Sequence, residues 1–177
     1  GPEVSFEEEG SLAYPIISGE GEKKWVEFLD LTRKNESPSD EVLKRWRTYG
    51  TDLPELIPAY LEEDFPQLKN RIVYFETSRG CPYLCSFCLS ALDKTVRYFD
   101  ETTIQKQIKE LITAGIEKIK FVDRTFNLKP SRMQKLMQWL TQFKGNEFHF
   151  EVVGDILTPE ILDFLETVPP GMFQFEI

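Results

Sequence analysis

A regular alternation of predicted strands and helices begins at Arg71, and this pattern limits the fold more than any other feature. Strands are expected over residues 72–76, 118–123, 148–153 and 172–177, with amphipathic helices over 102–114, 131–143 and 159–167. Gly115 ends the first helix, and Pro130 and Pro159 stand at the first turn of the other two. Strand-helix repeats with short connections predict a parallel sheet with right-handed crossovers.

The predicted fold class is α/β, and residues 71–177 are expected to form the first four strands of a partial, TIM-like (β/α) barrel. A closed eight-fold barrel takes roughly 250 residues, so four strands are only its N-terminal part. The chain ends on a predicted strand, and we therefore expect the native protein to continue.

The region before the alternation has a different pattern. Residues 1–35 predict short strands over 2–6 and 13–18 and then a helix behind Glu22, which indicates the C-terminal part of a Rossmann-like domain. Residues 36–70 are interrupted by Pro54, Pro58 and Pro66 and predict an inter-domain linker. A short helix within the linker, at about 39–49, would be capped by Ser39 or Asp40.

Composition excludes several classes of protein. The 177 residues include 41% hydrophobic and 13% aromatic side chains, enough to fill a core. Lys and Arg total 21 against 30 Asp and Glu, and the net charge of −9 disfavours non-specific binding to nucleic acid or anionic lipid. Apolar runs are far shorter than the roughly 20 residues that span a bilayer. We expect a soluble, cytoplasmic protein without nucleic-acid or membrane partners.

All three cysteines, Cys81, Cys85 and Cys88, lie within eight residues directly after the first predicted strand. Their odd number and close spacing disfavour a disulfide framework. In one alternative, the three cysteines pack as small buried side chains on one helix face, although Gly80 and Pro82 make a poor helix interior. In another, they bind structural zinc, but zinc would need a fourth ligand. Three thiolates also suit an iron-sulfur cluster with one open iron, at the strand end where parallel barrels build active sites.

The spacing CxxxCxxC at the end of the first strand of a partial barrel resembles the radical S-adenosylmethionine (SAM) superfamily. Residues 74–82 with 85–88 are similar to the subgroup that carries an N-terminal cobalamin-binding domain, and residues 1–6 and 17–22 resemble the closing part of that domain. Residues 121–127 and 173–177 narrow the resemblance to bacterial relatives of the anaerobic magnesium-protoporphyrin IX monomethyl ester oxidative cyclase. The resemblance covers nearly the whole chain.

This resemblance implies a 4Fe-4S cluster on Cys81, Cys85 and Cys88, with SAM chelating the fourth iron. It implies that one electron, from a flavodoxin- or ferredoxin-like donor, cleaves SAM to methionine and a 5'-deoxyadenosyl radical, which abstracts a hydrogen from a small-molecule substrate. Cobalamin would be a further cofactor of the full-length protein. Methyl transfer is the expected reaction, with oxidative ring closure as the alternative, and we expect the fragment alone to be inactive.

The resemblance also implies cofactor-binding residues beyond the cysteines. Phe87 occupies the position where the family places an aromatic residue near the adenine of SAM. The family's glycine-glycine-glutamate motif on the second strand is replaced here, and Asp123, with Asn127 four residues on, is the candidate partner for the amino group of SAM. Glu151 and Glu176 alternate with apolar neighbours, so each is expected to point its carboxylate into the barrel.

Two functions from other classes remain open at this stage. A zinc- or cluster-stapled, non-catalytic binding module would use the thiols only to hold the loop, and it would need a fourth protein ligand. A thiol redox protein would need only two of the three cysteines and is disfavoured. His149 carries no motif and is interpreted as a structural strand residue.

Overall fold

The computed structural model describes residues 15–48, 59–92 and 95–177. The chain divides into two compact units, Gly1–Asp52 and Leu53–Ile177. The predicted strand over 2–6 lies outside the described residues, and residues 15–18 of the second predicted strand are not in a strand.

In the first unit, the described residues form the helices α2 (Glu22–Lys34) and α3 (Asp40–Arg47). Ser39 caps α3 as expected, because its hydroxyl accepts a hydrogen bond from the amide of Val42 at 3.4 Å. Trp46 of α3 is fully buried and packs edge-on against Phe28 of α2, with ring centroids 6.0 Å apart. This aromatic contact makes α3 part of the first unit.

Residues 36–70, the predicted linker, therefore fall on both sides of the division. Their later part forms the short helices η1 (Glu62–Asp64) and α4 (Phe65–Leu68) in the second unit. Phe65 and Leu68 pack against the core of that unit, and the hydroxyl of Tyr60 accepts a hydrogen bond from the amide of Tyr74 at 3.1 Å. Apolar residues of the predicted linker are thus used for packing in the second unit.

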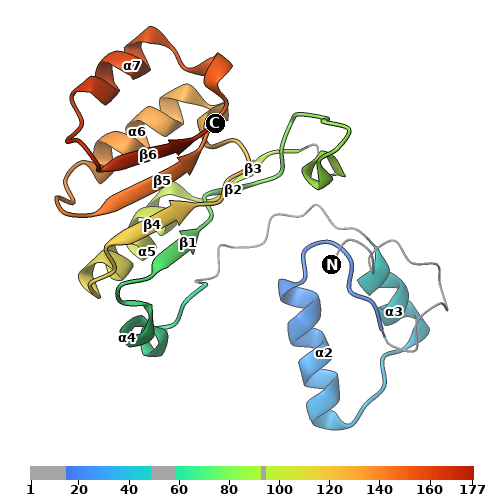
Figure 1. The fold of residues 1–177 in the computed structure, drawn as a ribbon. Helices are drawn as coiled ribbons and strands as arrows, with labels where there is room; N and C mark the ends of the chain where they lie inside the picture. Colours follow the sequence, from blue (N-terminus) through green and yellow to red (C-terminus); the bar gives the residue numbers. More distant parts are fainter. Residues whose placement is uncertain (1–14, 49–58, 93–94) are drawn as a thin grey trace. The chain divides into compact units, whose positions relative to one another are not determined.

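The second unit confirms the strand-helix alternation predicted from residue 71. One sheet contains four parallel strands in the order β1 (Ile72–Phe75), β4 (Lys118–Phe121), β5 (Glu147–Glu151) and β6 (Phe173–Glu176) (Figure 1). The connecting helices are α5 (Glu101–Thr113), α6 (Pro130–Leu140) and α7 (Pro159–Glu166). The strands end earlier than predicted, and the freed residues turn into the loops that build the candidate site.

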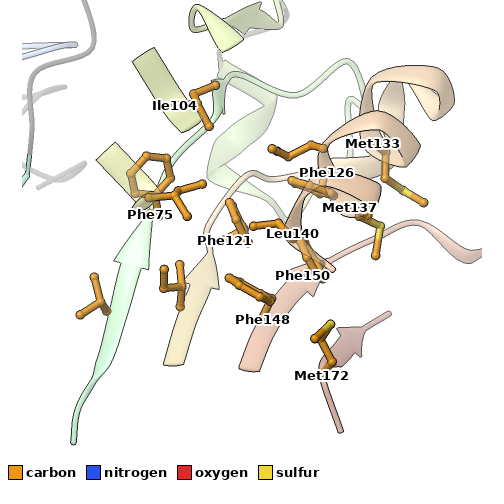
Figure 2. Packing of buried hydrophobic residues seen from close by; sticks show 14 of the residues in the cluster. Phe75, Ile104, Phe121, Phe126, Met133, Met137, Leu140, Phe148, Phe150 and Met172 are labelled. Carbon is orange, nitrogen blue, oxygen red and sulfur yellow. The ribbon is translucent and has the colours of Figure 1, made fainter. Parts of the chain in front are cut away.

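The helices cover one face of the sheet with a core rich in aromatic residues. Figure 2 shows Phe121, Phe148 and Phe150 on neighbouring strands, beside Met133 and Met137 of α6. The rings of Phe121 and Phe150 stack with centroids 4.9 Å apart. Dense aromatic packing of this kind stabilises the sheet and fixes the positions of the strand ends.

Several short elements were not predicted. β2 (Ser78–Arg79) and β3 (Arg97–Tyr98) form a small antiparallel ladder beyond the end of β1. The remaining pieces are the 3-10 helices η2 (Leu89–Leu92), η3 (Phe126–Leu128) and η4 (Gly154–Ile156). Within the described ranges, no helix has the length and apolar character needed to cross a membrane.

Candidate functional site

The β2–β3 ladder closes the loop that carries the cysteines. Ser78 pairs with Tyr98, and the amide of Phe99 donates a hydrogen bond to the carbonyl of Thr77 at 3.1 Å. Gly80, at the start of the loop, has φ of 91°, a value that disfavours residues with a side chain. The cysteines therefore lie on a loop with a fixed base, immediately after the carboxyl end of β1.

The three thiols are free, but they differ in exposure. Cys81 is 8% exposed, whereas Cys85 and Cys88 lie on the surface of the loop. A hydrogen bond with Ser90 lowers the pKa of the Cys88 thiol, and the positive charge of Arg124 adds a smaller effect in the same direction. A lowered pKa favours the thiolate, which is the form that binds metals.

The donor chemistry of this loop fits an iron-sulfur cluster, since it offers three cysteine sulfurs that form no disulfide and a lowered pKa at one of them. In the part of the chain that the structure describes, no three His, Cys, Asp or Glu side chains are grouped closely enough to hold a metal ion. Cluster binding would therefore require the three sulfurs to lie closer together than they do here.

Asp123 lies just after β4 and is 1% exposed. Its Oδ1 accepts hydrogen bonds from the hydroxyls of Thr77 at 2.6 Å and Ser78 at 2.5 Å, and its Oδ2 accepts one from the amide of Thr77 at 3.0 Å. Arg132 of α6 donates to the hydroxyl and carbonyl of Thr77 at 3.2 and 3.3 Å, and its guanidinium lies 4.8 Å from the ring centroid of Tyr98. Together these contacts brace the base of the cysteine loop against β4 and α6.

The burial of Asp123 predicts a pH-dependent stability. Burial raises the pKa of its carboxyl group, while the hydrogen bonds from Ser78 and Thr77 and the charge of Arg132 act in the opposite direction. With the folded pKa above the unfolded value of about 3.9, the folded state keeps a proton that the unfolded state loses. The contribution of protonated Asp123 to the free energy of unfolding is therefore complete below the unfolded pKa. It is lost as the pH rises through the folded pKa.

Urea unfolding of the wild type and of Asp123→Asn from pH 4 to pH 7 measures this contribution. We expect the free energy of unfolding of the wild type, relative to the variant, to fall as the pH rises, because asparagine does not titrate in this range. A difference that stays constant or increases over this interval would contradict the raised pKa.

Asn127, predicted to accompany Asp123, is fully buried in η3. Its Nδ2 donates to the carbonyl of Val153 at 2.7 Å, and its Oδ1 accepts from the amide of Val153 at 2.9 Å. This paired contact ties the loop after β4 to the end of β5. The predicted cofactor contact of Asn127 stays a prediction, and the structure assigns the side chain a clear bracing contact.

Phe87 is 91% exposed at the tip of the cysteine loop. Tyr83, Leu84 and Leu89 on the same loop are also exposed. An apolar ring with this exposure is available to stack on a planar ligand, which is compatible with the predicted adenine contact. No described contact yet fixes its orientation, and the predicted role stays a prediction.

Glu151 and Glu176 are neighbours in the β5–β6 register, at the carboxyl ends of their strands. Lys120 of β4 joins them, because its Nζ lies 2.8 Å from Glu176 and 3.5 Å from Glu151. His149 Nε2 is 3.6 Å from Glu176. The structure thus brings the two predicted acids together in one ion-pair network on the sheet face opposite the core. The hydrogen bond from Lys120 lowers the pKa of Glu176, so this carboxylate remains ionised.

Residues that sequence reasoning missed include Thr77, Ser78 and Arg132. Their side chains meet only because the carboxyl ends of β1 and β4 lie beside the first turn of α6, and their separation in the chain reaches 55 residues. The Thr-Ser pair directly before the motif was a signal that could have been followed, because hydroxyls beside a buried acid commonly hydrogen-bond to it.

Three curated proteins resemble the chain in sequence. It is 36% identical over 62 residues to the cobalamin-dependent radical SAM methyltransferase TokK of Streptomyces tokunonensis, a match that covers 34% of this chain and 9% of TokK. Over this stretch the chain is similar to a cobalamin-dependent radical SAM methyltransferase. A second match, 34% identical over 62 residues, is the 2-(S-pantetheinyl)-carbapenam-3-carboxylate methyltransferase of Streptantibioticus cattleyicolor, again with 34% and 9% coverage.

A longer match is an uncharacterized methyltransferase of Pyrococcus horikoshii, 28% identical over 156 residues that cover 75% of this chain and 34% of the relative. The chain thus spans between a tenth and a third of the length of these relatives. A search of protein-family profiles found no match.

Two solved structures of the radical SAM methyltransferase TsrM from Kitasatospora setae share the fold. One, with tryptophan and a SAM analogue bound, matches with a TM-score of 0.58 and 15% identity over 84% of this chain and 34% of TsrM. The other, with cobalamin and a 4Fe-4S cluster bound, gives a TM-score of 0.57 and 14% identity over 84% and 35%. This likeness confirms the α/β fold with a parallel sheet.

Proposed function

We propose that the chain is part of a cobalamin-dependent radical SAM methyltransferase, with a 4Fe-4S cluster on Cys81, Cys85 and Cys88. The observation that carries this proposal is the position of the cysteine loop. It begins directly at the carboxyl end of β1, in a parallel sheet whose fold matches that of TsrM. The kinship with TokK supports the same activity.

The domain assignments belong to this proposal. Residues 71–177 are the N-terminal part of a partial, TIM-like barrel, and residues 1–35 are the closing part of a cobalamin-binding, Rossmann-like domain. The one-sided helical cover of the sheet supports the barrel, because barrel strands also carry helices on their outer face. The complete enzyme, in the cytoplasm, would act on a small molecule with a flavodoxin- or ferredoxin-like electron donor, and the chain alone would be inactive.

When bound, the cluster would supply the electron that cleaves SAM, and cobalamin would carry the methyl group. The protein's own residues position these groups. The brace of Asp123, Thr77 and Arg132 holds the start of the cysteine loop, and the lowered pKa of Cys88 favours its ligand form. Phe87 would cover the adenine.

Asp123 is proposed to receive the amino group of SAM. An ionised carboxylate offers about four acceptor positions, and Thr77 and Ser78 use three of those of Asp123. One position therefore remains for an ammonium donor. Asn127 would keep the loop after β4 in place beside Asp123. Glu151 and Glu176 would face the ligand from β5 and β6, and the ammonium of Lys120 would partly neutralise their negative charge.

Methyl transfer is favoured over oxidative ring closure because the relatives found in sequence and structure are methyltransferases. The resemblance to relatives of the anaerobic magnesium-protoporphyrin ester cyclase stays part of the proposal. Both reactions would use the same cysteine loop.

Metal analysis after anaerobic reconstitution tests the proposal. The chain is incubated with ferrous iron, sulfide and an equal concentration of zinc, and the bound elements are quantified. We expect about four irons and four sulfides per chain, as a 4Fe-4S cluster requires. One tightly bound zinc per chain, without sulfide, would instead support the stapled binding module.

A further inference from the structure

Thr125 lies against the buried sulfur of Cys81. The distance from Thr125 Oγ1 to Cys81 Sγ is 3.8 Å, which is within hydrogen-bonding range for sulfur. Both side chains are shielded from water, since Thr125 is 5% and Cys81 8% exposed. Bulk water therefore has little access to this contact, and a hydroxyl held there has a larger electrostatic effect than one at the surface.

The backbone around Thr125 is fixed on both sides. Two residues earlier, Asp123 is hydrogen-bonded to Thr77 and Ser78. Immediately after it, Phe126 packs in the core, with its ring centroid 4.6 Å from that of Phe150. The hydroxyl is thus held beside Cys81 by the same contacts that connect β4 to β1 and β5, and its position does not depend on the exposed part of the cysteine loop.

The hydroxyl has a single proton, and the structure offers it two acceptors. Thr125 Oγ1 donates to the carbonyl of Arg124 at 2.8 Å, which leaves the thiol of Cys81 as the donor in the contact with Thr125. A cysteine sulfur that binds iron has no proton. In that state the hydroxyl of Thr125 is the group in this pair that can donate, and rotation about its Cβ–Oγ bond redirects the proton to the sulfur.

We propose that Thr125 donates a hydrogen bond to the Cys81 sulfur when that sulfur ligates iron, and that this bond raises the reduction potential of the cluster. The inference rests on the proposed function. Reduction adds negative charge that the ligating sulfurs share, and a donor beside one of them stabilises the reduced state more than the oxidised state. Thr125 is thus a positioning residue that acts through Cys81.

Potentiometric titration of the reconstituted chain, followed by electron paramagnetic resonance, tests this inference without enzyme activity. Thr125→Val keeps the shape of the side chain and removes the donor, and Thr125→Ser keeps the donor. At the wild-type midpoint potential, we expect the ratio of reduced to oxidised cluster in Thr125→Val to fall about three- to tenfold, where tenfold corresponds to about 59 mV for one electron. Thr125→Ser should remain within about twofold of the wild type.

Thr125→Ala is a second variant without the donor, and it gives the potential even if the valine variant assembles no cluster. Thr167→Val, on the far end of α7, is the matched control, because its hydroxyl also donates to a nearby carbonyl. Equal reduction potentials in the wild type and both donor-free variants would overturn the inference. So would a shift in Thr125→Ser as large as that in Thr125→Val, and in either case the cluster itself would still be present. A wild-type chain that binds no cluster would instead overturn the proposed function, and this inference with it.

Discussion

Phe150→Ala is expected to lower the free energy of unfolding of the second unit by about 3–5 kcal/mol. Phe150 is fully buried, and its ring contacts those of Phe121, Phe126, Phe173 and Phe175, with centroid distances between 4.6 and 5.8 Å. Alanine would leave a cavity between three strands and the η3 turn, and rings packed this closely have little freedom to fill it. Urea unfolding followed by fluorescence measures the loss.

Phe87→Ala is the matched control for this prediction, because the same side chain is removed at a position that is 91% exposed. We expect its free energy of unfolding to remain within about 0.5 kcal/mol of the wild type. A similar loss in both variants would show that the aromatic core of the second unit is not packed as the structure describes. If Phe87 covers the adenine as proposed, its variant would weaken SAM binding while stability stays unchanged.

Cys81→Ser, Cys85→Ser and Cys88→Ser are each expected to reduce the bound iron after anaerobic reconstitution to less than about a tenth of the wild-type amount. The chain has three cysteines, so every substitution leaves two sulfur ligands. Cys85 and Cys88 are exposed, and their replacement should change the free energy of unfolding by no more than about 0.5 kcal/mol. The measurement is iron and sulfide content beside an unfolding curve for each variant.

Ser86→Ala, in the same loop between Cys85 and Cys88, is the control, and it should retain iron because its exposed hydroxyl is not a ligand in the proposed site. Full iron content in any single cysteine variant would contradict the assignment of that cysteine. Retention in all three would mean that iron is bound elsewhere.

The sequence was sufficient to predict the parallel sheet because its signals are local. Apolar periodicity, with Gly115, Pro130 and Pro159 at helix ends, is independent of what each helix packs against. The β2–β3 ladder could not be predicted in this way. It consists of two residues a side, and its pairing follows from the closure of the cysteine loop and not from strand propensity.

The sequence indicated which residues the candidate site would contain, but not which contacts they would make. The position of Asp123 at a strand end indicated a carboxylate near the cysteines, but its hydrogen bonds to Thr77 and Ser78 depend on how β1 and β4 align. Glu151 and Glu176 were expected to share a face, and strand alternation explains why they do. Their partner Lys120 was missed, because a lysine in a strand gives no indication of its cross-strand neighbours.

The central claim is that the cysteine loop holds a cluster with an iron open to SAM. The most direct measurement is electron paramagnetic resonance of the anaerobically reconstituted and reduced chain, before and after addition of SAM. We expect a 4Fe-4S signal that changes shape and position when SAM binds, since the fourth iron has no protein ligand in the proposed site. A cluster signal that is unaffected by saturating SAM, or a site filled by zinc in place of iron, would contradict the account.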